Sequence, residues 1–500
     1  MKIKDLHPAE VWSLFDKITA VPRPSKKEGK IVAFLLDFAQ EHGLEAEKDA
    51  ADNVIIRKPA TVGFDKRKTV ILQSHVDMVC EKNSMTFDFE NDPIQTYVED
   101  GWVKARGTTL GADDGIGMAA ALAILTAKDI EHGPINALFT TDEETGLNGA
   151  NNIKPEFLKG DILLNLDSEE WGEFCIGCAG GKHTRGTFTY RWEPAPSKYF
   201  WFELKVSGLT GGHSGSDIHR ELGNANKILA RYLYKLMRNE QIFIADIDGG
   251  NLHNAIAREA QAIVGVPVAF KDKAVALLNI LQTELIAELP AEDRELQLQI
   301  NTVHTPPQVI DKKATRDLIY ALYALPHGAI SWNQDIPGMV ETSTNLASIK
   351  MRENQKIVVT TSQRSASSSA KEDLVTRMGI IFRLASAEEQ TTEGYPGWKP
   401  DPESEILKIG KKYYKTLYGD DPKIISIHAG LECGLFKEKN PLLDMMSCGP
   451  TILGAHSPEE RLEIATVSKW WDLLKAILKN IPLAANPEPP NKKTQKTLAR

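Results

Sequence analysis

The sequence contains few cysteines, five among 500 residues. An odd and sparse count does not build a disulfide framework and is typical of a reducing compartment. The sequence also lacks any apolar run of about 18 residues, so we expect no membrane-spanning helix. Residues 1–18 contain no apolar segment behind a basic one, so we expect no signal peptide. These absences predict a cytoplasmic protein.

An excess of positive charge is also missing. The chain has 59 lysines and arginines against 68 aspartates and glutamates, which gives a formal net charge of −9. This balance argues against nucleic acid and anionic membranes as partners. The hydrophobic content of 42% is ordinary for a globular protein, and the length predicts two or three domains.

The first third of the chain alternates helix and strand patterns. Apolar strands are predicted at 69–74, 134–141 and 161–166, and an alanine-rich helix at 115–127. This alternation predicts an α/β domain with a mostly parallel central sheet flanked by helices. In such sheets the functional groups gather at the carboxyl ends of the strands, where acidic residues lie in this sequence.

Two polar, proline-containing connectors, 191–197 and 393–402, separate a middle block of different character. Long helices and alternating strands make this block α+β, and the α/β pattern resumes after it. We therefore predict a catalytic domain in two parts, 1–188 and 397–485, interrupted by a large α+β domain at 189–396. The tail, 486–500, is rich in proline and lysine, and we expect it to be disordered.

Histidines and carboxylates stand at the ends of several predicted strands. Taken singly, each has a plain explanation as a strand-end histidine, a helix cap or a solvated acidic turn. Their convergence on one edge of one sheet instead predicts a metal site, and a mixed histidine and carboxylate set suits zinc, with cobalt or manganese as substitutes. The candidates are His75, Asp77, Asp113, Glu143, Glu144, Asp167 and His456.

Asp113 lies in a glycine-rich turn, residues 107–117, that opens a predicted helix. The turn lacks the lysine and hydroxyl residue with which a phosphate-binding loop ends, so we do not interpret it as one. A carboxylate at the head of this turn has the position to bridge two cations.

These motifs resemble the aminoacyl-histidine dipeptidases, also called Xaa-His dipeptidases or peptidase D, within the wider class of two-zinc aminopeptidases, carboxypeptidases and deacylases. The resemblance covers residues 5–483. It rests on KARGTTLGAD (104–113), CAGG (178–181), GGHSG (211–215), GNANK (223–227) and HAGLECG (428–434).

The resemblance implies two zinc ions and a role for each candidate ligand. His75 and Asp167 would bind one zinc, Glu144 and His456 the other, and Asp113 would bridge them. It also implies a cis peptide bond after Asp113.

The remaining roles are implied in the same way. Asp77 would orient a ligand histidine, and Glu143 would act as general base toward the attacking water. His213, in the inserted domain, would contact the oxygen of the tetrahedral intermediate. Asn254 and Arg364 would hold the C-terminal carboxylate of the substrate.

The resemblance implies hydrolysis of dipeptides, with Xaa-His dipeptides such as β-alanyl-histidine as substrates. It also implies that the inserted domain is a lid, which in relatives either pairs two subunits or folds back over its own site, and we expect a homodimer through it. A tripeptidase and a deacylase of N-acyl amino acids are alternatives of the same class. Tripeptidases usually have lysine where this chain has Gly115, which favours the dipeptidase. An inactive metal-binding scaffold is an alternative of a different class.

Overall fold

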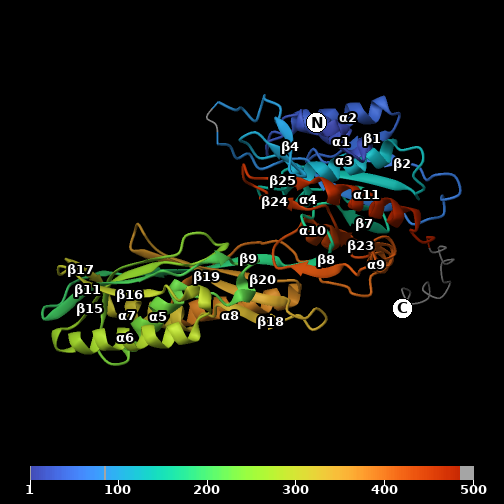
Figure 1. Cartoon of the computed structure of the whole chain (residues 1–500). Coiled ribbons are helices and arrows are strands. Elements are labelled where there is room, and N and C mark those ends of the chain that lie inside the picture. The colour runs from blue at the N-terminus through green and yellow to red at the C-terminus, as the bar shows by residue number, and fades with distance from the viewer. Residues whose placement is uncertain (1, 84–85, 485–500) are drawn as a thin grey trace, which may run out of the picture. The chain divides into compact units, whose positions relative to one another are not determined.

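The computed structural model describes residues 2–83 and 86–484, so the predicted disordered tail lies outside the described residues. Within this part the chain forms two compact units (Figure 1). Among the described residues, unit 1 consists of residues 2–83, 86–176, 401–424 and 436–484, and unit 2 of Gly177–Pro400 and Ile425–Leu435. The domain limits predicted at residues 188, 396 and 485 stay a prediction.

An eight-stranded sheet with a parallel centre has six strands wholly in unit 1, while its last two strands include residues of unit 2. The strand order is β1 (Glu45–Lys48), β2 (Val54–Lys58), β6 (Ile135–Thr140), β3 (Val70–His75), β7 (Ile162–Asn165), β23 (Asp444–Ser447), β8 (Glu173–Cys178) and β22 (Lys423–Ile427). Strands β6, β3, β7 and β23 pair in parallel, whereas β1, β2 and β8 pair antiparallel with their neighbours. The predicted mostly parallel central sheet is confirmed.

Helices flank this sheet, and α3 is the most deeply buried of them. The helices are α1 (Ala9–Thr19), α2 (Gly29–Glu41), α3 (Ala112–Thr126), α4 (Asn148–Asn151), α9 (Glu405–Tyr418), α10 (Glu432–Lys439) and α11 (Ile464–Lys479). Helix α3 contacts both β3 and α1. Its alanines and glycines allow this close packing against both neighbours, and Thr126 is the only one of its residues that is not buried.

A smaller sheet completes unit 1. Its strands are β24 (Ile452–Leu453), β25 (Arg461–Glu463), β5 (Trp102–Ala105) and β4 (Thr96–Glu99), all paired antiparallel.

Among the described residues, no helix combines the length and the apolar character that crossing a membrane requires.

Unit 2 has an antiparallel sheet with helices along it, which confirms the predicted α+β character of the middle block. The strand order is β16 (Gln297–Thr302), β11 (Tyr199–Ser207), β15 (Ala260–Pro267), β13 (Phe243–Gly249), β19 (Val340–Arg352), β20 (Lys356–Ser365), β9 (Gly180–Thr189) and β21 (Glu388–Thr391), with β18 (Gly328–Trp332) also on β19. Helices α5 (Ala225–Met237), α6 (Lys271–Glu288), α7 (Lys312–Ala324) and α8 (Ser368–Leu384) lie on the same face of this sheet (Figure 1).

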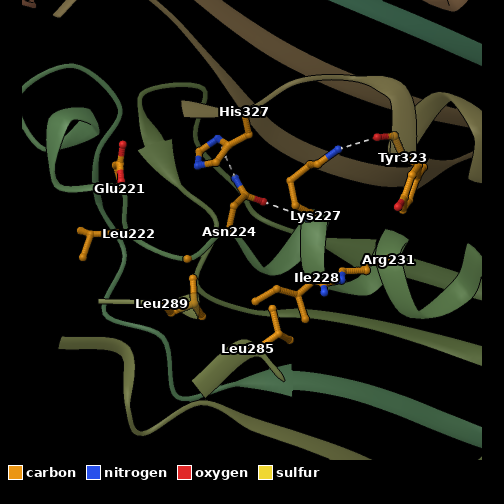
Figure 2. A pocket seen from close by; sticks show the side chains of 11 residues that line it. Glu221, Leu222, Asn224, Lys227, Ile228, Arg231, Leu285, Leu289, Tyr323 and His327 are labelled. Atoms are coloured by element: carbon orange, nitrogen blue, oxygen red, sulfur yellow. Dashed lines mark hydrogen bonds between the residues drawn. The ribbon is translucent and has the colours of Figure 1, made fainter. Parts of the chain in front are cut away.

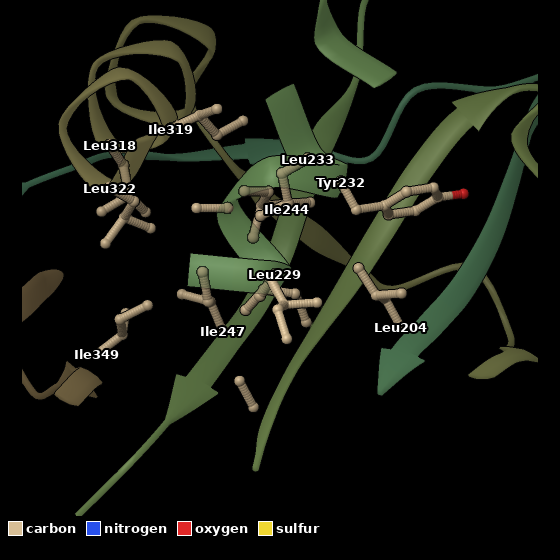
Figure 3. Packing of buried hydrophobic residues seen from close by; sticks show 14 of the residues in the cluster. Leu204, Leu229, Tyr232, Leu233, Ile244, Ile247, Leu318, Ile319, Leu322 and Ile349 are labelled. Carbon is tan, nitrogen blue, oxygen red and sulfur yellow. The ribbon is translucent and has the colours of Figure 1, made fainter. Parts of the chain in front are cut away.

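The core of unit 2 lies between these helices and the sheet. Leu229 and Leu233, one turn apart on α5, pack with Ile244 of β13 and Leu322 of α7 (Figure 3). Each of these side chains is fully buried. Burial of such a side chain contributes about 1.5–3 kcal/mol.

The predicted polar connector at 191–197 contains a short strand, β10 (Trp192–Pro194), which pairs with β17 (Gln308–Ile310). Proline is tolerated there because a two-stranded ribbon leaves one side of each strand without a hydrogen-bonding partner. A second ribbon joins β12 (Gly212–His213) to β14 (Ala255–Ile256).

Candidate metal centre

The parallel strands of unit 1 bring three of the predicted ligands to one edge of the sheet. His75 is the last residue of β3, Glu144 follows β6, and Asp167 follows β7. Because these strands run parallel as neighbours, their carboxyl ends meet at the same edge. Asp113 lies at the start of α3, and His456 lies between β24 and β25.

The five side chains converge on one site in unit 1. His75 Nε2 lies 2.9 Å from Asp113 Oδ1 and 3.9 Å from Asp167 Oδ1. His456 Nε2 lies 3.2 Å from Asp113 Oδ2 and 3.1 Å from Glu144 Oε2. The two oxygens of Asp113 therefore face two different imidazoles, as a bridging carboxylate requires.

The charges at this site fit a cation. His75 is 1% exposed and Asp113 8% exposed, so both are shielded from water. Burial, and next the Asp113 carboxylate, raise the pKa of Asp167 well above its usual value. Within the described residues, Glu144 Oε1 is buried without a hydrogen-bond partner. Carboxylates crowded in this way repel one another unless a cation lies between them, and the donor set of imidazoles and carboxylates suits zinc, cobalt or manganese.

Imidazole–carboxylate contacts also set the protonation of the two histidines. Hydrogen bonding to Asp113 and then to Glu144 raises the pKa of His456 to about 11. Burial opposes protonation of His75, but its contacts with Asp113 and Asp77 raise the pKa of His75 well above the usual value. The neighbouring carboxylates therefore stabilise positive charge between them, where the rings of His75 and His456 lie.

Asp77 connects the site to the loop after β6. Its Oδ1 lies 3.4 Å from His75 Nδ1 and accepts a hydrogen bond from Glu143 N at 3.0 Å. Its Oδ2 accepts from Glu144 N at 3.3 Å and from Ser25 Oγ at 2.8 Å. Burial opposes ionisation, but His75 and the backbone of Glu143 lower the pKa of Asp77 to about 2. Asp77 thus stays ionised and holds both the His75 ring and the loop that carries Glu143 and Glu144.

A second acidic group supports the same loop, and two of its members, Glu28 and Asp142, were not among the predicted site residues. Glu28, Asp77 and Asp142 have carboxylate oxygens within 4.8 Å of one another. Glu28 Oε1 accepts hydrogen bonds from Lys26 N at 2.7 Å and Asp142 N at 3.1 Å. These contacts place Glu28 as a carboxylate that holds backbone. Nothing in the sequence distinguishes it from a surface residue of the charged segment 26–30.

His213 lies in unit 2, on the β12–β14 ribbon. Its Nδ1 is oriented toward two backbone N–H groups, those of Ser216 at 3.0 Å and Gly215 at 3.3 Å. Burial, and next the positive charge of Arg364, lower the pKa of His213. A neutral ring that accepts at Nδ1 carries its proton on Nε2. Nε2 is therefore available as a hydrogen-bond donor.

Unit 2 also gathers imidazoles around Arg364. The ring centroids of His183 and His253 are 4.3 Å apart. Burial lowers the pKa of His183 to about 4 and that of His428 to about 3, and the Arg364 guanidinium contributes to both shifts. Arg364 Nη1 donates to Tyr395 Oη at 3.0 Å, and in the described part of the chain its buried Nε has no partner. The His183 and His428 imidazoles are therefore neutral near pH 7, and the Arg364 guanidinium is the positive charge that is complementary to a carboxylate.

Asn254 lies in the turn before β14. Its backbone oxygen accepts a hydrogen bond from Ser214 N at 2.7 Å, next to His213 in the chain. The structure thus links the Asn254 turn to the His213 loop within unit 2.

The segment at 223–227 has a structural explanation. Asn224 Oδ1 accepts from Lys227 N at 3.2 Å, which caps α5 at its start. Lys227 Nζ donates to the carbonyl oxygens of Leu322, Tyr323 and Leu325 at 3.0, 2.8 and 2.6 Å. Both residues, labelled in Figure 2, line a cavity, and its volume is about 580 Å³. One segment therefore caps the start of α5 and the end of α7.

The peptide bond between Asp113 and Asp114 is cis, in agreement with what the resemblance implies.

Comparison with known proteins identifies the family. Cytosol non-specific dipeptidase of Escherichia coli (strain K12) is 42% identical over 482 residues, which cover 96% of this chain and 99% of the relative. The crystal structure of aminoacylhistidine dipeptidase from Vibrio alginolyticus superposes with a TM-score of 0.93 at 43% identity, covering 97% of this chain and 99% of that one.

A more distant structure shares the fold. Aminopeptidase PepT from Bacillus cereus ATCC 10987 gives a TM-score of 0.61 at 17% identity and covers 95% of this chain and 99% of that one. The sequence profile of peptidase family M20/M25/M40 matches residues 71–480. The chain therefore belongs to peptidase family M20/M25/M40.

Proposed function

We propose that this protein is a cytoplasmic two-zinc dipeptidase whose substrates include Xaa-His dipeptides such as β-alanyl-histidine. The observation that carries the proposal is the convergence of His75, Asp113 and Glu144 at one buried edge of the sheet. The names of the relatives from Escherichia coli and Vibrio alginolyticus, which this chain covers almost completely, support dipeptides as the substrate class. The name of the first relative and the sparse cysteines support the cytoplasm.

The proposed ligands divide between two cations. His75 and Asp167 would hold one, Glu144 and His456 would hold the other, and Asp113, which lies near both histidines, would be shared between them. Zinc is the proposed metal, with cobalt and manganese as substitutes. When bound, the cations supply polarisation of the scissile carbonyl and a lowered pKa for the attacking water.

Glu143 is the proposed proton carrier. Its backbone N–H is held by Asp77, beside the ligand Glu144. From this position its carboxylate takes a proton from the attacking water and donates it to the leaving amine. Asp77 keeps this loop and the His75 ring in fixed positions.

Unit 2 supplies the proposed substrate contacts. His213 donates from Nε2 to the oxygen that becomes negative in the tetrahedral intermediate, because its Nδ1 already accepts from the backbone. Arg364 and Asn254 bind the C-terminal carboxylate of the dipeptide, and the guanidinium suits a bidentate contact. Arg364 Nε, which is buried without a hydrogen-bond partner among the described residues, supports this assignment.

A hydrolysis panel on purified, zinc-loaded protein tests the proposal. The panel contains free-amine dipeptides with and without C-terminal histidine, tripeptides, and N-acylated amino acids, with Glu143→Ala as the blank. We expect turnover of dipeptides, which the blank lacks. Preferential turnover of tripeptides or acylated amino acids would assign one of those activities instead. No turnover of any substrate by zinc-bound protein would identify an inactive scaffold.

A homodimer through the inserted domain is also proposed. In unit 2, β18 exposes Ile330 and Trp332, which are 39% and 42% exposed, on a strand that pairs with β19. Light scattering coupled to gel filtration checks the mass. Substitution of Trp332 by Glu should shift a dimer toward the monomer, and an unchanged dimer would contradict the use of this strand.

A further inference from the structure

Glu460 is a buried carboxylate that binds the glycine-rich turn of unit 1. It is 2% exposed and lies four residues after His456. Its Oε2 accepts from the backbone N–H groups of Leu110 at 2.7 Å and Gly111 at 2.9 Å. Its Oε1 accepts from Ala112 N at 2.7 Å and Asp113 N at 3.3 Å. Four consecutive amides of the turn thus point at one side chain.

This arrangement explains the glycine-rich turn. Consecutive N–H groups that point inward form an anion-binding concavity, and here the chain's own carboxylate fills it. Gly111 has a φ of +69°, which suits glycine and aims its amide at Glu460. The turn therefore binds an internal anion.

Arg23 holds the opposite side of the same turn. Arg23 is 2% exposed, and its guanidinium donates to the carbonyl oxygens of Val76 at 3.0 Å, Asp77 at 2.8 Å and Gly111. Gly111 therefore donates its N–H to Glu460 and accepts at its C=O from Arg23. Arg23 also joins the turn to the segment that directly follows His75.

We propose that Glu460 is a positioning residue that fixes the Asp113 carboxylate against His456 and thereby sets the metal affinity of the site. The inference rests on the proposed function, in which Asp113 contacts both cations. The covalent path from His456 to Glu460 is only four residues long, so the carboxylate ties the loop of one ligand to the backbone of another. Groups that orient metal ligands typically contribute about 10- to 100-fold in affinity.

Glu460→Gln is the variant that tests the proposal, and Glu459→Gln is its matched control. Glutamine keeps the shape of the side chain but turns an NH₂ group toward two of the four backbone N–H donors. Glu459 is exposed and adjacent, so its substitution removes the same charge without touching the turn. Metal affinity is measured by competition with a chromogenic zinc chelator, and amide exchange at residues 110–113 is followed in metal-free protein.

Glu460→Gln should bind zinc about 10- to 100-fold more weakly. The amides at 110–113 should exchange faster, and kcat should fall more than KM changes. Glu459→Gln should match the wild type in all three. Wild-type zinc affinity in folded Glu460→Gln would overturn the inference, even if its melting temperature fell.

Glu460→Asp keeps the proposal falsifiable if the glutamine variant does not fold. Aspartate retains the charge but is one methylene too short to reach all four amides, so zinc affinity should again be reduced. Unchanged affinity in this variant would also overturn the inference. The proposed function fails separately, because it requires that the wild-type protein bind zinc and hydrolyse dipeptides.

Discussion

Substitution of Asp77 by Asn tests how the site is held in place. Asp77 accepts hydrogen bonds from the backbone of Glu143 and Glu144 and lies 3.4 Å from His75 Nδ1. Asparagine keeps one acceptor oxygen and turns an NH₂ group toward the other partners, so at least one hydrogen bond to a charged acceptor is lost. Such a bond contributes about 1.5–3 kcal/mol, which corresponds to roughly a 10- to 100-fold change in metal affinity.

The assay is a zinc titration by chelator competition, together with kcat/KM on a dipeptide. Asp161→Asn is the matched control, because the exposed Asp161 also accepts a backbone N–H, that of Thr69 at 2.8 Å, but just before the start of β7. We expect Asp77→Asn to lose affinity and kcat/KM by this factor and Asp161→Asn to lose neither. Wild-type zinc affinity in folded Asp77→Asn would refute the reasoning.

Three further predictions follow from the contacts. Glu143→Gln should retain bound zinc and lose kcat by several orders of magnitude, and near-normal turnover would remove Glu143 from the mechanism. Gly115→Ala should lower the unfolding midpoint in urea, because a Cβ there would lie 2.6 Å from Arg23 Nη2. In an open helix the same substitution stabilises by about 1 kcal/mol, so a raised midpoint would contradict the contact. Lys227→Met should lower the free energy of unfolding by about 1–3 kcal/mol, because three carbonyls lose their donor. Lys235→Met on the same helix breaks a partly exposed ion pair with Glu284 and should lower it by less than about 1 kcal/mol. Equal losses would refute the capping role of Lys227.

The ligand candidates could be predicted from sequence because strand direction determines where they lie. His75, Glu144 and Asp167 each follow an apolar run, and parallel strands place such positions together. The mostly parallel sheet could be predicted for the same reason, since helices separate its strands. The α+β character of the middle block was visible in its composition and periodicity.

Asp77 could be predicted because it lies two residues after the candidate ligand His75, but Glu460 and Arg23, which also hold the ligand loops, could not. Glu460 stands beside Glu459 in a polar segment, and Arg23 lies in a basic, proline-containing one, so both look like surface residues. Their burial depends on contacts with residues 110–113 and 76–77, far away in the chain. Strand β10 was missed because three residues with a proline carry no periodicity.

The position of the cations tests the central claim most directly. Crystals of the zinc-loaded protein, measured at the zinc absorption edge, give an anomalous difference map that locates the metal without reference to any assumed ligand. The account predicts two peaks per chain, one beside His75 and Asp167, the other beside Glu144 and His456, with Asp113 between them. Peaks elsewhere, or zinc-loaded crystals without peaks at these side chains, would contradict it.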